Sequence, residues 1–265
     1  MATARRTKVI TSNPMEFLTQ VPNPEAAIVD EEDEDAIGEG LDEKELASLI
    51  AGFKPSSLFP IVVLAAACGA RRNELLALRW TDLDVAGKKL RIERALEQTK
   101  KYGIRVKPPK TKRGFRTIDL DELTVNMLVA EHAKHQRVMS GIPDAAGDAV
   151  VSLVKLPAKA LIFPAMPSGD EEFDLTRCRN PRNFSKEFAR RAGVIGFGAT
   201  RFHDLRGVHA TALLDAGWPV NRVADRIGDD PAVLLRNYAK RKRAKQTDEA
   251  LTSTLSTFAT GFLGS

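Results

Sequence analysis

The chain has 265 residues, of which 43% are hydrophobic and 28% charged, and this composition excludes disordered, collagen-like and disulfide-stapled proteins. Its two cysteines, Cys68 and Cys178, lie far apart, so the sequence predicts neither a disulfide framework nor a clustered zinc site. The longest apolar run, Phe59 to Cys68, has about half the length of a membrane span. We therefore expect a soluble, intracellular protein with one large domain or two modest ones.

Charge is unevenly distributed along the chain. Residues 1–50 contain 4 Lys/Arg and 12 Asp/Glu, a net charge of −8, whereas the whole chain carries +5, so the remaining 215 residues carry +13. A basic body behind an acidic leader favours binding to a polyanion such as nucleic acid. The alternative is an ordinary soluble protein with a high isoelectric point.

The first forty residues are interpreted as a leader, because they contain three prolines that break any long helix and six consecutive acids at Asp30–Asp35. The globular part begins after them. An N-cap at Asp42 predicts a helix to about Ala51, closed by Gly52. A second helix, capped by Ser57, is expected to run until Gly69.

A short helical stretch is predicted over Arg71–Trp80. The pattern then changes to alternation at Leu90 and Ile92 and again over Arg116–Leu120, which predicts a small antiparallel sheet of two or three strands. Helical periods return with a helix from Leu123 to about Met139 and a loop over Gly141–Asp148. The remaining predicted helices cover Pro181–Gly193, His203–Ala216, Val220–Ile227 and a last segment from Pro231 towards Tyr238. The fold class is therefore α+β and mainly helical, with a small sheet inserted among the helices.

Common cofactor, nucleotide, zinc and hydrolase motifs are absent from the sequence. Basic and phenolic features remain. Arg71 follows the helix-ending Gly69, where an arginine beside a helix N-terminus can bind an anion; the alternative is a surface arginine paired with Glu74. His203 and Arg206 are three residues apart and share a helix face. His132 and His135 have the same spacing, but their charged neighbours predict an exposed helix face.

Two further features are basic. Tyr238, one of two tyrosines, precedes a run of basic residues that would stabilise a phenolate; its alternative is an interfacial tyrosine beside a solvated charge run. The turn Lys110–Arg116 is suited to reach a DNA groove or backbone, or else it is a charged, soluble turn.

In combination these features resemble the catalytic domain of the tyrosine recombinase (phage integrase) family. The segment Gly69–Asp84 is similar to the first arginine box of that family, His203–Thr211 to its second box, and Val233–Ala239 to its nucleophile helix. The resemblance covers roughly Leu41 to Lys245. It divides the chain into a leader or linker (1–40), a catalytic domain (41–247) and a C-terminal tail helix (248–265).

The resemblance implies a role for each matching residue. Arg71 and Arg206 clamp the scissile phosphate, His203 assists proton transfer, and Tyr238 attacks phosphorus. Lys110 protonates the departing 5′-oxygen, with Lys112 as the alternative for that role. The basic side chains expected to contact DNA are Arg72, Lys112, Arg113, Lys240, Arg241, Lys242 and Arg243.

One position departs from the family pattern. Where a histidine or tryptophan usually donates a hydrogen bond to phosphate, this chain has Asp229. An ionised carboxylate cannot donate and repels a phosphate nearby. We therefore expect either that Asp229 turns away from the site or that activity is reduced.

The implied function is site-specific recombination through a covalent 3′-phosphotyrosine intermediate, without cofactor or metal. The implied partners are double-stranded DNA and further recombinase protomers, docked by the tail around Leu251–Leu263. Forty residues are too few for the core-binding domain that family members usually carry, so we expect a catalytic fragment with weak, salt-sensitive DNA binding. The expected location is the bacterial cytoplasm, on nucleoid, plasmid or phage DNA. The alternatives are a non-catalytic or impaired DNA-binding module and a type IB topoisomerase.

Overall fold

The computed structural model describes residues 40–99, 101–109, 112–141, 151–168 and 171–245. The acidic leader, the predicted loop at 142–148 and the predicted tail helix lie outside these residues and stay predictions. The helices are α2 (Glu43–Phe53), α3 (Phe59–Cys68), α4 (Arg72–Leu75), α5 (Glu122–Ser140), α7 (Pro181–Val194), α8 (Asp204–Asp215), α9 (Val220–Ile227) and α10 (Pro231–Lys245). The strands are β1 (Leu83–Asp84), β2 (Lys89–Ile92), β3 (Ala95–Thr99), β4 (Gly103–Lys107) and β5 (Arg116–Asp119), with 3₁₀ turns η1 (Trp80–Asp82) and η2 (Lys112–Gly114). The predicted mainly helical α+β class is confirmed.

Helix α2 begins where the sequence predicts. The Glu45 N–H donates to Asp42 Oδ1 (2.8 Å) and the Asp42 N–H donates to Glu45 Oε2 (2.7 Å), which forms a capping box. The predicted end at Gly52 is wrong, because the helix continues to Phe53. A Cβ atom at Gly52 would lie 2.6 Å from Ile195 Cδ1, so this glycine permits close packing instead of ending the helix.

Helix α3 ends as predicted at Gly69, whose left-handed φ of 64° suits glycine. The predicted cap at Ser57 is wrong: Leu58 is the N-cap, without a side-chain bond, and the Leu58 N–H donates to Ser56 Oγ. The helical stretch after Gly69 is shorter than predicted. Helix α4 stops at Leu75 because the following residues form backbone contacts with a distant segment, including the bond from the Ile162 N–H to the Leu78 carbonyl.

The predicted sheet is confirmed as a three-stranded antiparallel sheet in the order β1-β2-β5. Leu90 pairs with Ile118, and both side chains are buried, as their alternation with polar residues indicates. A second antiparallel ladder, β3-β4, is missing from the sequence prediction. Its strands bury few side chains, chiefly Leu96 and Thr99, so they lack the apolar alternation that reveals a strand.

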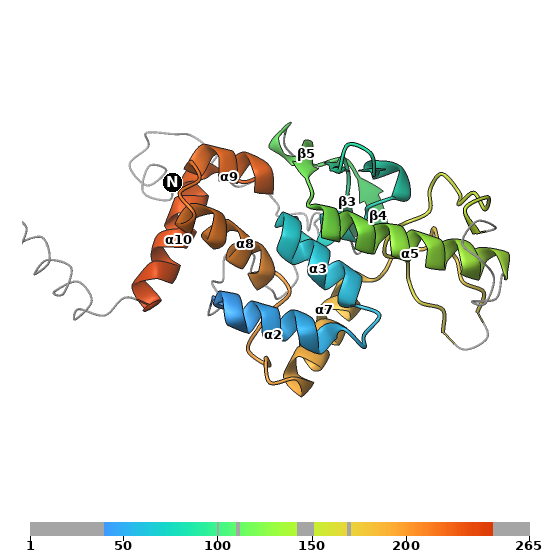
Figure 1. Cartoon of the computed structure of the whole chain (residues 1–265), viewed down its shortest axis with the longest axis horizontal. Helices are drawn as coiled ribbons and strands as arrows, with labels where there is room; N and C mark the ends of the chain where they lie inside the picture. The colour runs from blue at the N-terminus through green and yellow to red at the C-terminus, as the bar shows by residue number, and fades with distance from the viewer. Residues whose placement is uncertain (1–39, 100, 110–111, 142–150, 169–170, 246–265) are drawn as a thin grey trace, which may run out of the picture.

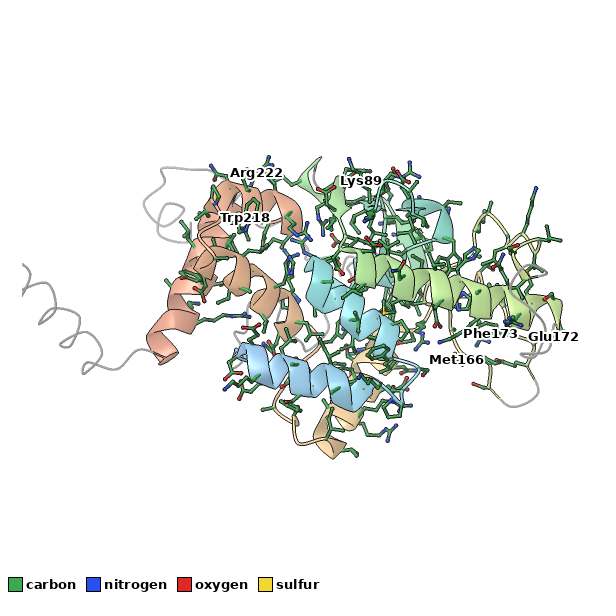
Figure 2. The ribbon with its side chains drawn as sticks, viewed as in Figure 1. Lys89, Met166, Glu172, Phe173, Trp218 and Arg222 are labelled. Carbon is green, nitrogen blue, oxygen red and sulfur yellow. The ribbon has the colours of Figure 1, made fainter. Side chains whose placement is uncertain are left out.

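The elements form two packed groups. A large core joins α2, α3, α5, α7 and the sheet, whereas a small core of Ala210, Val223, Ala224, Ile227 and Leu234 holds α8, α9 and α10 together. Helix α3 packs on α8 and links the groups. Helices α8 to α10 occupy one end of the molecule (Figure 1). Trp218 and Arg222 lie at that end, and Phe173 and Glu172 at the other (Figure 2).

The predicted exposure of His135 is wrong. The residue is 6% exposed, because Trp80 and Phe173 cover it, and the Trp80 Nε1–H donates to His135 Nδ1 over 3.1 Å. Burial lowers the pKa of His135 to about 4. His132 is half-buried against the same Trp80 ring. In the described part of the chain, no helix has the length and apolar composition needed to cross a membrane.

Candidate functional site

One pocket brings together most of the catalytic residues selected from the sequence. It has a volume of about 110 Å³, and its walls come from the start of α4, from α8 and from α10. Five of the selected residues line it: Arg71, His203, Arg206, Asp229 and Tyr238. Lys110 lies outside the described residues, so its place relative to the pocket stays a prediction.

Arg71 occupies the N-cap position of α4, immediately beyond the turn made by Gly69 and Ala70. Its Nη1 lies 3.2 Å from Glu74 Oε1, and its own N–H donates to Glu74 Oε2 over 2.9 Å. The sequence alternative of pairing with Glu74 is therefore observed. Arg71 nevertheless lines the pocket, because its Nη2 reaches the Gly228 carbonyl beyond α9 (2.9 Å).

A buried ion pair between Glu74 and Arg116 adjoins Arg71. Glu74 is 3% exposed, and Arg116 on β5 donates to both of its carboxylate oxygens over 3.0 and 2.7 Å. Burial raises the pKa of Glu74, but the bonds and charges of Arg116 and Arg71 outweigh this effect and hold the pKa below its ordinary value. Glu74 is thus an ionised anchor that fixes the orientation of Arg71.

Arg206 is the most enclosed cation of the pocket, with a side chain only 6% exposed. Its Nη1 donates to the carbonyls of Gly69 (2.8 Å) and Ile227 (2.6 Å), the residues at the ends of α3 and α9. Burial and the neighbouring Arg71 charge lower the pKa of Arg206 to about 10, against the opposing effect of Asp229. Arg206 therefore stays charged at neutral pH.

Asp229 does not turn away from the arginines, contrary to one of the two outcomes expected from the sequence. Its Oδ2 accepts a hydrogen bond from Arg206 Nη2 over 3.1 Å, and its Oδ1 lies 3.6 Å from Arg71 Nη2. The preceding Gly228 has a left-handed φ of 73° and ends α9. One carboxylate therefore bridges both guanidinium groups.

His203 is the N-cap residue of α8, one turn before Arg206, so the two side chains line the same pocket. Burial lowers the pKa of His203 to about 4, and the positive charge of Arg206 acts in the same direction. The imidazole is consequently neutral at neutral pH. A neutral imidazole carries one donor and one acceptor nitrogen.

Tyr238 lies on α10 and borders the pocket, but its hydroxyl is engaged elsewhere. The hydroxyl donates to Asp215 Oδ1 over 2.8 Å. Asp215 is the last residue of α8, so the tyrosine is tied to the opposite end of the helix that carries Arg206 near its start.

Arg241, which the sequence predicts as a DNA contact, also lines the pocket, one turn after Tyr238. Its guanidinium lies against Gly207, where a Cβ atom would overlap it. Its Nε and Nη1 are buried with no hydrogen-bond partner among the described residues. Burial lowers the pKa of Arg241.

The other predicted DNA contacts whose side chains the structure describes do not line the pocket. Arg72 donates to Ser185 Oγ on α7 over 2.6 Å. Arg113 lies 3.0 Å from Asp230 at the start of α10, and Lys240 is exposed. The side chains of Lys112, Lys242 and Arg243 are not described.

Two partners of the site are not predicted from the sequence. Asp215 lies 238 − 215 = 23 residues before Tyr238, and no local pattern connects them. Arg116 is apparent only as part of a basic turn, although it holds Glu74 across a sequence distance of 42 residues. The spacing of Arg71 and Glu74 is the one signal that indicates a member of this network.

A family model described as "Phage integrase family" matches residues 40–244. A curated relative, "Tyrosine recombinase XerC-like" from Caldanaerobacter subterraneus subsp. tengcongensis, is 26% identical over 221 residues, which are 80% of this chain and 53% of that protein. The chain thus spans about half the length of the curated relative it matches.

Solved structures of recombinases share the fold. The Tn1549 transposon integrase in complex with a circular intermediate DNA has a TM-score of 0.59 at 17% identity, covering 97% of this chain and 75% of that one. The XerA recombinase has a TM-score of 0.53 at 16% identity, covering 83% and 62%. At these identities the similarity concerns the fold alone.

Proposed function

We infer the function of this chain from the family to which it belongs, the phage integrase family, and propose that it is the catalytic part of a site-specific DNA recombinase. It cleaves and rejoins strands through a covalent 3′-phosphotyrosine intermediate. The observation that carries this proposal is the convergence of Arg71 and Arg206 on one anionic group, in a pocket that Tyr238 also lines.

The two arginines bind the scissile phosphate. A phosphodiester gains negative charge on its non-bridging oxygens during attack, and preorganised guanidinium groups stabilise that charge. The carboxylate of Asp229 shows that an anion fits within contact distance of both groups. Glu74 keeps Arg71 oriented, and the Gly69 and Ile227 carbonyls keep Arg206 oriented.

Tyr238 is the nucleophile. Its phenolic oxygen forms a bond to phosphorus while the bond from phosphorus to the 5′-oxygen breaks; the phenol loses its proton and the 5′-oxygen gains one. His203, neutral before DNA binds, assists this proton movement, and Lys110 is the proposed acid for the 5′-oxygen. Because the phosphotyrosine ester retains the energy of the broken bond, the reverse attack rejoins the strand.

The DNA duplex and further copies of the recombinase are the proposed partners. Arg72, Arg113, Lys240 and Arg241 are the described basic side chains that we assign to DNA contact, together with Lys112, Lys242 and Arg243. The expected site of action is bacterial nucleoid, plasmid or phage DNA. We expect the chain by itself to bind DNA weakly, with an affinity that falls steeply with salt.

A second candidate is a DNA-binding module without catalysis. Asp229 favours this alternative, because it occupies both arginines with a group that cannot donate a hydrogen bond to phosphate. Losing one oxyanion-type donor costs about 10² to 10³ in rate, so we expect impaired cleavage instead of none.

The test is a suicide duplex, nicked so that the cleaved end diffuses away, incubated with this chain and with Tyr238→Phe. We expect a DNA-linked band in denaturing gels for the native chain alone. The same assay is run with a core-binding domain fused upstream, which adds a second contact with the DNA. If the folded, DNA-bound fusion gives no DNA-linked band, the recombinase proposal is overturned in favour of the non-catalytic module.

A further inference from the structure

The carboxylate of Asp229 occupies the place in the pocket where a phosphate would bind. It contacts Arg206 over 3.1 Å through one oxygen and approaches Arg71 to 3.6 Å through the other. A phosphodiester offers two anionic oxygens to a pair of guanidinium groups in a comparable arrangement. Asp229 and a DNA phosphate therefore require the same donors.

The donors of Arg206 divide into two sets. Nη1 has two hydrogens, and the Gly69 and Ile227 carbonyls accept from it, so this nitrogen is fixed to the protein backbone. Nη2 faces Asp229 instead. A side-chain carboxylate can rotate away while its backbone stays in place, whereas the two carbonyls cannot. The Nη2 bond to Asp229 is consequently the one that a ligand can replace.

The backbone that carries Asp229 is held mainly by other groups, because the Asp229 N–H donates to the Ala224 carbonyl over 2.9 Å; the carboxylate adds one local bond, in which its Oδ1 accepts from the Asp230 N–H over 3.1 Å. Arg71 Nη2 donates to the Gly228 carbonyl over 2.9 Å, and Arg113 pairs with the neighbouring Asp230 over 3.0 Å. The Asp229 side chain is 24% exposed, so it has an open side into which it can rotate. Rotation of the carboxylate breaks its bond from the Asp230 N–H and its contacts with the arginines, whereas the bond from the Asp229 N–H to the Ala224 carbonyl does not involve the side chain.

We propose that Asp229 is an internal competitor of the DNA phosphate, which occupies the arginine pair until bound DNA displaces it. This inference rests on the proposed function, because it concerns regulation of the same site. The negative charge of Asp229 compensates the positive charges of Arg71 and Arg206. It thereby lowers the affinity of the pocket for free anions in solution. Only a phosphate positioned by the rest of the duplex competes effectively.

The first test measures the binding of inorganic phosphate by isothermal titration calorimetry to the native chain, Asp229→Asn and Asp229→Glu. Removal of the carboxylate is expected to tighten phosphate binding at least tenfold, whereas the glutamate variant retains weak binding. Asp225→Asn is the matched control: it removes the same charge from an exposed position on α9, outside the pocket lining. Equal affinities for the native chain and Asp229→Asn overturn the inference.

The second test is the rate at which the suicide duplex becomes linked to protein. Asp229→Asn, and Asp229→His as a second variant, are expected to form the Tyr238-dependent band at least tenfold faster than the native chain. Circular dichroism verifies that each variant folds. A band whose rate is unchanged or reduced in both variants overturns the inference alone. Tighter phosphate binding by Asp229→Asn without any band, even in the fused protein, supports the inference and overturns the recombinase proposal.

Discussion

The hydroxyl of Tyr238 donates a hydrogen bond to Asp215 across 2.8 Å. Asp215 and Arg206 lie on the same helix, 215 − 206 = 9 residues apart, which is about 13.5 Å along the helix axis at 1.5 Å per residue. The bond therefore holds the proposed nucleophile towards the end of α8 that is remote from the phosphate clamp. In the proposed mechanism the hydroxyl gives up this bond as it attacks phosphorus.

Asp215→Asn is expected to accelerate covalent linkage to the suicide duplex about fivefold. An amide accepts a weaker hydrogen bond than a carboxylate does, by about 1 kcal/mol, so the hydroxyl is released more readily. The measurement is the single-turnover rate of band formation. Asp225→Asn, which removes an exposed carboxylate from α9, should leave the rate unchanged. A slower Asp215→Asn reaction contradicts the prediction and assigns Asp215 a role in accepting the phenolic proton.

Arg71→Lys is expected to reduce the rate of covalent linkage by about 10² to 10³, because a lysine cannot replace a planar guanidinium that bonds Glu74 and the phosphate together. Arg72→Lys is its matched control. It changes the same residue type one position later, but Arg72 bonds Ser185 on α7 and does not line the pocket. An Arg71→Lys rate equal to that of the native chain would show that positive charge alone, and not the Arg71 geometry, governs the reaction.

Stability should fall as the pH drops from about 6.5 towards 4. Burial lowers the pKa to about 4 for His135, for His203 and for His209, an α8 residue whose Nδ1 lies 2.9 Å from the Ala66 carbonyl. An unfolded histidine titrates near 6.5. Between these values the unfolded chain binds more protons than the native one, so acid favours unfolding, by up to about 1.4 kcal/mol per pH unit for each histidine. The contribution is fully present above pH 6.5.

Thermal unfolding followed at pH 7.0, 6.0 and 5.0 checks this expectation. Glu74 stays ionised in the native state over this pH range, because its pKa is lowered. His135→Gln should flatten the dependence, since glutamine can still accept the Trp80 hydrogen bond but does not titrate there. An unfolding temperature that is constant from pH 7.0 to 5.0 would contradict the prediction.

Local patterns predict the parts of this molecule that depend on neighbouring residues. The cap at Asp42, the end of α3 at Gly69 and the strand alternation at Leu90 are confirmed, because each is set within a few residues. The predicted exposure of His135 is wrong, because Trp80 and Phe173 cover this residue from distant segments of the chain.

The candidate site follows the same division. The sequence selects Arg71, His203, Arg206 and Tyr238, and the structure brings all four to one pocket. The sequence does not reveal that Asp229 bridges two of these residues or that Asp215 binds the tyrosine. These contacts depend on the packing of α8 against α9 and α10. Side-chain partners across helices are set by tertiary structure, which no sequence period encodes.

Arg206 has a mechanical consequence beyond its charge. One of its nitrogens joins the last turn of α3 to the last turn of α9, and so ties the large core to the small one. Any hinge motion that separates the two groups must break these bonds and release the guanidinium from its orientation. One side chain therefore both lines the proposed phosphate site and joins the two cores, so a shift of one core against the other would disturb that site.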